Sequence, residues 1–237
     1  MQRNKFRFTL ISFLLGIASG AHAGIPVALD ADPMRDIQWA KEAQDWIKTA
    51  EFYKDSMQNY QQQLASQTGL RDVVGLVNQA KGLKNDIMDL QKQGISLNDL
   101  LSSGNAPSGA LDSLYSKYKD FDVCGVQSVA AYATACKQET INKAWMIEQT
   151  NDVQETVSST LDDISSLTDR VANAKDAKES QDLANSINLK SIQLNTITNQ
   201  WEMNMKAADQ RAKLLEEKRK KAFHDQQYNA PVPTYSY

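Results

Sequence analysis

The chain has 237 residues, with 26 Lys and Arg against 29 Asp and Glu, and a formal charge of −3. This mild acidity argues against nucleic acid as the main partner, because phosphate binding needs a net basic face. Gly and Pro are few, at 10 and 5 residues, whereas residues that favour helices, such as Gln, Ala, Lys and Leu, are abundant. The composition therefore predicts an all-α protein of one domain, or of one domain with a subdomain.

Residues 1–23 have the pattern of a cleaved export signal. Arg3, Lys5 and Arg7 precede an apolar run from Phe8 to Ala18, and Ala21-His22-Ala23 follows it. Cleavage between Ala23 and Gly24 leaves 214 residues with a formal charge of −6. The apolar run is too short to span a bilayer, which needs about 20 residues. We therefore expect export from the cytoplasm, with no membrane span after signal cleavage.

A first long helix is predicted within residues 24–69. Asp32 followed by Pro33 is typical of a helix start, and Gly69 suits a helix end. Apolar residues between them alternate at steps of four and three: Trp39, Ala43, Trp46, Ala50, Tyr53, Met57, Tyr60 and Leu64. Such a heptad pattern predicts packing in the core. A sugar- or peptide-binding strip is the alternative interpretation of its aromatic residues.

Residues 70–129 are interrupted by glycines and a proline, which prevent long helices. Short helices are plausible at 71–78, 85–93, 97–101 and 110–118, with Ser96 as the cap of the third. We expect an appendage of short helices at one end of the long ones. Partner contacts are expected here, because loops and caps carry recognition more often than rigid rods do. A purely structural cap is equally compatible with the sequence.

Residues 130–222 are predicted to form a long helical hairpin. The second arm carries an apolar stripe at Leu183, Ile187, Leu194, Ile197, Trp201, Met205, Ala208, Ala212 and Leu215. The first arm repeats the spacing less regularly, at Ile141, Trp145, Val153, Val157, Leu161, Ile164, Leu167 and Val171. Between the arms, Asp176 is suited to N-cap the second helix, and Glu179 completes a capping-box pair. Because one hairpin cannot hide both stripes, the first helix is expected to complete an elongated three-helix bundle with coiled-coil spacing.

Residues 223–237 are predicted to form a flexible C-terminal tail, since they contain Pro231, Pro233 and three tyrosines. The basic residues between Lys213 and Lys221 precede this tail. Cations are favoured near the negative end of a helix, which explains them. A basic anchor for a membrane or for acidic partners is the alternative.

Cys124 and Cys136 are the two cysteines of the chain. In an exported protein such a pair is expected to form a disulfide. A continuous helix would hold them about 18 Å apart, whereas a disulfide needs Cα atoms within about 7 Å. The chain must therefore reverse between them for the bridge to form. An intermolecular bridge and a redox pair are the alternatives, although the spacing differs from that of Cys-x-x-Cys.

The sequence predicts no catalytic, cofactor-binding or metal-binding residue. Once the signal is removed, His224 is the one histidine left, which argues against a His-rich metal site and a Ser-His-Asp triad. Carboxylate pairs such as Asp162-Asp163 and Glu216-Glu217 are expected on polar helix faces, where solvation and ion pairing explain them. We therefore expect a protein that is not an enzyme and binds no cofactor.

Three motifs together resemble the minor pilus subunit family of bacterial type IV secretion systems. They are Ala23-Gly-Ile-Pro-Val27 directly after the export signal, Gln67-Thr-Gly-Leu-Arg71 at the end of the first helix, and Lys178-Glu-Ser-Gln-Asp-Leu-Ala-Asn-Ser-Ile187. The resemblance spans most of the mature chain and depends on the order of these short motifs. It implies a three-helix bundle with a loose appendage of small helices.

The same resemblance implies export to the periplasm and assembly with the major pilin and other secretion-system subunits. The protein would be located at the tip of an extracellular pilus, where it would assist pilus assembly and contact with a recipient or host cell through a surface receptor. A soluble periplasmic helical scaffold or chaperone for secretion-system subunits is the alternative, because an acidic chain of long helices fits it equally. An enzyme with a site of several carboxylates is a weaker alternative, since a slender bundle rarely provides a pocket.

Overall fold

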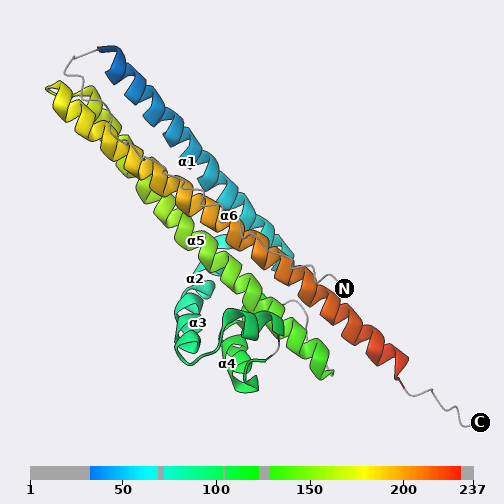
Figure 1. The fold of residues 1–237 in the computed structure, drawn as a ribbon. Helices are drawn as coiled ribbons and strands as arrows, with labels where there is room; N and C mark the ends of the chain where they lie inside the picture. Colours follow the sequence, from blue (N-terminus) through cyan, green and yellow to red (C-terminus); the bar gives the residue numbers. More distant parts are fainter. Residues whose placement is uncertain (1–32, 69–71, 104, 123–128, 231–237) are drawn as a thin grey trace, which may run out of the picture. The chain divides into compact units, whose positions relative to one another are not determined.

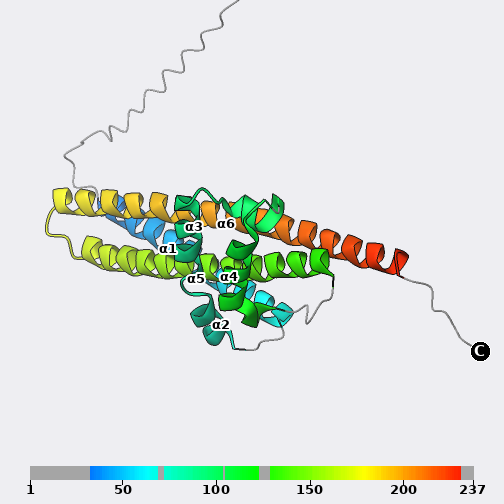
Figure 2. The same ribbon diagram turned by 90° about the horizontal axis from the view of Figure 1, so that it is seen from below.

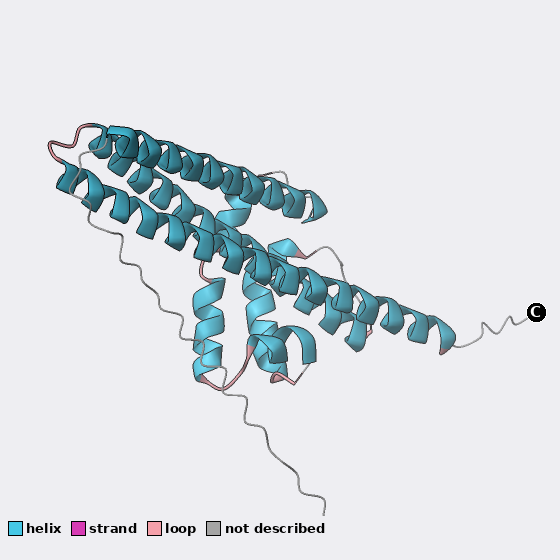
Figure 3. Ribbon diagram, turned by 45° about the horizontal axis from the view of Figure 1, so that its top comes forward, coloured by secondary structure: helices cyan, strands magenta, loops and turns pink. Residues whose placement is uncertain are grey.

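The computed structural model describes residues 33–68, 72–103, 105–122 and 129–230. These residues form helices and their connections without any strand, so the predicted all-α class is confirmed (Figure 3). Three helices are long, namely α1 (Pro33–Thr68), α5 (Ala130–Ala172) and α6 (Ala177–Tyr228). Between α1 and α5 lie α2 (Val73–Ala80), α3 (Leu83–Lys92), the π-helix η1 (Asp99–Ser103), α4 (Ser108–Tyr118) and the 3-10 helix η2 (Lys119–Phe121). The predicted signal, residues 1–23, lies outside the described residues.

Helix α5 is central, because every other helix contacts it. Helices α1 and α6 run along it, and Figures 1 and 2 show the short helices grouped against its N-terminal half. The insert of short helices therefore lies along the side of α5, not at one end of the long helices as predicted. The reason is that the short helices have apolar faces to bury: Leu76, Leu83 and Leu100 are 2%, 0% and 0% exposed.

The core consists of two clusters of buried apolar side chains. The smaller one lies near the turn between α5 and α6 and contains Ala43, Ile164, Val171, Leu183 and Ile187. The larger one includes side chains from all three long helices and from every short helix. Trp46 of α1 packs against both clusters. The insert thus shares its core with the long helices.

The heptad of α1 packs into the core as predicted. Ala43, Ala50 and Met57 are fully buried. Three aromatic residues of the same heptad pattern, Trp46, Tyr53 and Tyr60, are partly buried and pack against the larger cluster. These rings are therefore core residues and do not form an exposed binding strip.

The stripe of α6 differs at a few positions from the predicted one. Ser191 and Thr198 are fully buried, whereas Ile197 and Ala212 are only partly buried. The hydroxyl groups of Ser191 and Thr198 donate hydrogen bonds to carbonyl oxygens one turn earlier, at 2.9 and 3.0 Å, which satisfies them inside the helix. Lys190, beside Ser191 in the sequence, lies outside the stripe, and its ammonium pairs with the Asp163 carboxylate at 2.6 Å.

Asp176 N-caps α6 as predicted. Its carboxylate accepts hydrogen bonds from the backbone N–H groups of Lys178 and Glu179, at 3.0 and 2.9 Å. The carboxylate of Glu179 accepts one from the N–H of Lys175 at 3.0 Å, so the reciprocal bond reaches the residue before the cap. This turn closes the hairpin of α5 and α6.

The predicted start of a flexible tail at residue 223 is wrong. Helix α6 continues to Tyr228 and includes His224. Residues such as Ala222 and the glutamines before Tyr228 have good helix propensity, which explains the continuation. The helix ends at Asn229, whose N–H and Nδ2 both donate to the carbonyl oxygen of Asp225, at 3.1 and 2.8 Å. The remainder of the predicted tail, residues 231–237, lies outside the described residues.

Two leucines of α6 test the packing, because Leu194 is fully buried and Leu189 is 69% exposed. We expect Leu194→Ala to lower the free energy of unfolding by about 2–5 kcal/mol, through lost burial and the cavity left behind. Leu189→Ala is the control and should change it by about 0.5 kcal/mol or less. Urea denaturation followed by circular dichroism measures both, and equal losses would contradict the orientation of α6.

Candidate functional site

Several residues singled out in the sequence fall outside the described part of the chain. These are Ala23 and Gly24 at the predicted cleavage site, and Cys124. Cys136 lies in the second turn of α5 and is 4% exposed, so its pairing with Cys124 remains a prediction. The structure brings together a different set of polar side chains, which surround α5.

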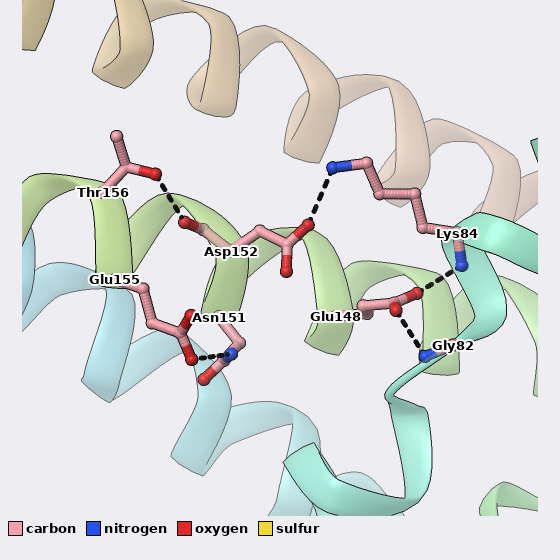
Figure 4. A network of polar contacts seen from close by, with 7 residues as sticks. All are labelled: Gly82, Lys84, Glu148, Asn151, Asp152, Glu155 and Thr156. Atoms are coloured by element: carbon pink, nitrogen blue, oxygen red, sulfur yellow. Dashed lines mark hydrogen bonds and ion pairs between the residues drawn. The ribbon is translucent and has the colours of Figure 1, made fainter.

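Glu148 of α5 binds the N-terminus of α3. Its two carboxylate oxygens accept hydrogen bonds from the backbone N–H groups of Gly82 and Lys84, at 2.7 and 2.6 Å (Figure 4). The first N–H groups of a helix have no partner within that helix, and the helix dipole favours a negative charge beside them. Glu148 therefore supplies the cap that the Gly82 position of α3 cannot provide with a side chain of its own.

Gly82 allows the backbone conformation that this capping requires. Its φ angle of 97° lies in the left-handed region, where a side chain would cause strain. The chain turns there between α2 and α3, and the N–H groups on either side of Leu83 face the same carboxylate. The glycine and the glutamate, 66 residues apart, thus act together.

Glu148 is protected from water, since only 7% of the residue is exposed. Burial raises the pKa of its carboxyl group, while the hydrogen bonds from Lys84 and Gly82 oppose that rise. One turn further along α5, the Asp152 carboxylate forms an ion pair with Nζ of Lys84 at 2.9 Å (Figure 4). The start of α3 is therefore held to α5 by backbone and side-chain contacts together.

The η1 segment is also held to the long helices by its backbone. Nε2 of Gln138, on α5, donates a hydrogen bond to the carbonyl oxygen of Leu100 at 2.9 Å. The ammonium group of Lys218, on α6, donates to the carbonyl oxygen of Ser102. The insert therefore has polar attachments to both α5 and α6.

Within the insert, Asp86 links α3 to α4. Its carboxylate accepts a hydrogen bond from the Tyr118 hydroxyl at 2.9 Å and pairs with the Lys117 ammonium at 2.8 Å. Burial, followed by the bond to Asp86, raises the pKa of Tyr118. The short helices are thus joined to one another as well as to α5.

A second group of buried polar residues joins α5 to α6. Asn142 is fully buried, and its Nδ2 donates to the carbonyl oxygen of Ala208 at 3.0 Å. Its Oδ1 accepts a hydrogen bond from Nε of Arg211 at 3.1 Å. The Arg211 guanidinium lies 5.0 Å from the centre of the Trp145 ring, a cation–π contact, and burial lowers its pKa.

Aromatic residues extend this group to α1. Nε1 of Trp201 donates a hydrogen bond to the hydroxyl oxygen of Thr150 at 3.1 Å. The Tyr60 ring meets the Trp201 ring edge to face, with centres 6.0 Å apart, and its hydroxyl donates to Asp209 at 3.1 Å. Helices α1, α5 and α6 are therefore linked by specific contacts at one level.

Glu139 lies between two cations in the N-terminal part of α5. Its carboxylate pairs with Nζ of Lys143 at 3.2 Å and with Nη1 of Arg219, from α6, at 3.1 Å. Lys143 is only 8% exposed. A charge in such a position is costly unless it is paired, so Glu139 makes its burial possible.

These polar groups hold helices in place, and most of their donors and acceptors bind other groups of the protein. Nη2 of Arg211 is an exception, because it is buried without a hydrogen-bond partner among the described residues. In the part of the chain that the structure describes, no three His, Cys, Asp or Glu side chains are close enough to hold a metal ion. The sequence analysis missed this set of residues. The available signal was a charged residue in an apolar position, since Glu148 follows Trp145 at the three-residue step where the stripe of α5 requires an apolar side chain.

The family model of Type IV secretion system proteins matches residues 24–220. The chain belongs to this family. Its members act in type IV secretion, which indicates other subunits of such a system as partners. No curated protein and no solved structure matches the chain. None of the described helices combines the length and the apolar character needed to cross a bilayer.

Glu148→Gln tests the capping of α3. Gln keeps the shape but offers one acceptor oxygen, so one of the two N–H groups faces an amide donor instead. We expect the free energy of unfolding to fall by about 1–3 kcal/mol, with faster hydrogen exchange in the first turn of α3. Glu155→Gln is the control, because that exposed carboxylate accepts a bond from Asn151 on its own helix. Unchanged exchange in α3 of the Glu148→Gln protein would contradict the capping role.

Proposed function

We propose that this secretion-system protein is a minor, tip-located subunit of a secretion or conjugative pilus, which assists pilus assembly and contact with recipient or host cells. The observation that carries the proposal is the family match over residues 24–220, combined with the minor pilus motifs in their order. Three long helices with short helices inserted after the first fit the three-helix bundle and appendage expected of such a subunit.

The proposed route begins with export. The signal would be removed between Ala23 and Gly24, and the mature chain would reach the periplasm before assembly on the cell surface. The start of the family match at residue 24 supports this boundary, because the matched region begins at the first residue of the proposed mature chain. No membrane span is needed for this route.

We propose that the protein acts by contact and catalyses no reaction. The carboxylates nearest the core, such as Glu139 and Glu148, bind donors of the protein itself. The insert supplies exposed apolar side chains, with Val74 71% and Met88 41% exposed, and these are suited to contact the major pilin or another subunit. A receptor on a recipient or host cell is a further partner in this proposal.

Pili sheared from the cell surface provide the test. The tagged protein is expected in the sheared fraction together with the major pilin. Val74→Glu should lower its amount there and lower pilus-dependent transfer, because a charge is placed at the proposed contact. Leu189→Glu, with similar exposure on α6, is the control for an added charge. A protein that stays in the periplasm, while pili form normally without it, would contradict the proposal.

A periplasmic scaffold or chaperone for secretion-system subunits is the second candidate function. The acidic charge of the mature chain, −6, together with its long helices favours this reading. Purification of the native protein distinguishes the two candidates. Recovery of an unfolded client without pilus subunits would favour the chaperone, and recovery of assembled pilus subunits would favour the pilus.

We also propose that Cys124 and Cys136 form a disulfide within the chain, which would attach the insert to the start of α5. Loop closure would contribute about 3 kcal/mol to stability. Peptide mapping without reductant should therefore give one cross-linked pair of peptides, and Cys136→Ser should increase protease cleavage between the insert and α5. A disulfide-linked dimer, or equal cleavage of both proteins, would contradict an internal bridge.

A further inference from the structure

The last turns of α6 carry a concentration of positive charge. Residues 211–228 contain six Lys and Arg against three Asp and Glu, a formal charge of +3 in a chain whose total is −3. Internal ion pairs use two of these cations, Arg219 with Glu139 at 3.1 Å and Lys220 with Glu216 at 2.7 Å. Within the described residues, Lys213 and Lys221 form no ion pair. This end of α6 is therefore a basic surface on an acidic protein.

A cavity of about 400 Å³ opens beside these cations, between α6 and the first turns of α5. Small apolar side chains line part of it: Ala131 and Ala135 from α5, and Ala222 from α6. Lys218, Lys221 and Asp225 line it from α6. Figures 1 and 2 show α6 extending beyond the start of α5, so the cavity lies at an open end of this helix pair. Its volume is within the range of protein ligand sites, about 300–1,000 Å³.

The η1 segment fixes two polar side chains of this cavity. Lys218 donates to the carbonyl oxygen of Ser102, and Gln138 donates to that of Leu100. These bonds hold the two side chains at the wall of the cavity before any partner arrives. Lys221, on the same wall, forms no ion pair within the described residues, so its ammonium group is available to an external group.

We propose that this cavity and the basic end of α6 bind an acidic segment of a partner protein. An apolar side chain of the segment would occupy the alanine-lined cavity, and its carboxylates would lie beside Lys221 and Lys218. Charge complementarity supports an acidic occupant, and a concave site with an apolar lining suits a side-chain anchor better than a flat membrane surface. This inference goes beyond the proposed function, because it assigns the partner's chemistry and does not require a pilus.

Two peptides of equal size test the proposal: acetyl-Glu-Asp-Leu-Phe-Asp-Glu-amide and its neutral counterpart, acetyl-Gln-Asn-Leu-Phe-Asn-Gln-amide. In a nuclear magnetic resonance titration of the full chain, the acidic peptide should shift the amide signals of Ala131, Thr134 and Ala222. Its binding should weaken as salt is added, because salt screens exposed charges. The neutral peptide should bind about tenfold more weakly, which corresponds to about 1.4 kcal/mol. Equal binding of the two peptides, or shifts confined to other helices, would overturn the proposal.

Charge reversal on α6 gives the matched pair of variants. Lys221→Glu should weaken binding of the acidic peptide about tenfold, whereas Lys178→Glu, in the first turn of the same helix, should change it less than about twofold. Equal effects of the two variants would overturn the proposal.

Filling the cavity supplies an independent readout. Thr134 lines the cavity and is exposed, so Thr134→Trp should remove peptide binding and retain the helical circular dichroism of the wild type. If that variant does not fold, the charge-reversal pair decides. Binding of the wild type to phosphatidylglycerol vesicles but not to the acidic peptide would overturn the proposal in favour of a membrane surface. None of these results depends on the presence of the protein in sheared pili.

Discussion

The burial of the N-terminal half of α5 is the constraint on which the rest of the structure depends. Between residues 135 and 150 this helix is covered by α1, α6 and the short helices, so its polar side chains cannot rely on water. Each must find a partner within the protein, because an unsatisfied buried polar group costs free energy. Asn142 finds the carbonyl oxygen of Ala208, and Glu148 finds the start of α3. A sliding motion of one helical turn would break these contacts.

Apolar packing and polar pairing therefore make different contributions. Heptad stripes of Leu, Ile and Ala stabilise helix association, but they repeat along the helix and accommodate more than one register. A buried charge pair is a poor source of net stability, yet the loss of one partner is strongly destabilising. Glu139, between Lys143 and Arg219, has this property. The apolar side chains thus favour association of the helices, and the buried polar contacts select how α6 and the insert lie along α5.

The sequence predicts those parts of the fold that depend on interactions between residues close together in the chain. The heptad of α1 and the Asp176 cap depend on local spacing and local hydrogen bonds, and both are present in the structure. Pro231 and Pro233 predict an irregular tail, but the helix-forming residues before them continue α6 to Tyr228. The Glu148 contact could not be predicted in the same way, since its partner is the backbone of a turn 64 to 66 residues away. Glycine at position 82 and a charge within an apolar stripe were visible separately, but their pairing depends on how the insert docks.

The covering of α5 determines which surfaces of the protein other molecules can contact. Because α5 is covered between residues 135 and 150, a partner there meets the outer faces of α1 and α6, the insert, and the end of α6. Helix α6 has 52 residues against 43 in α5, so its last turns extend past the start of α5 and expose Tyr228, at 91%, near Lys221. From Phe223 to Tyr228 every residue of α6 is exposed, so these residues are accessible to a partner. The bonds from Lys218 and Gln138 to the backbone of η1 then hold the insert in place beside this end. This arrangement suits the contact function proposed above, since the insert and the end of α6, which are remote in sequence, are held together by these bonds.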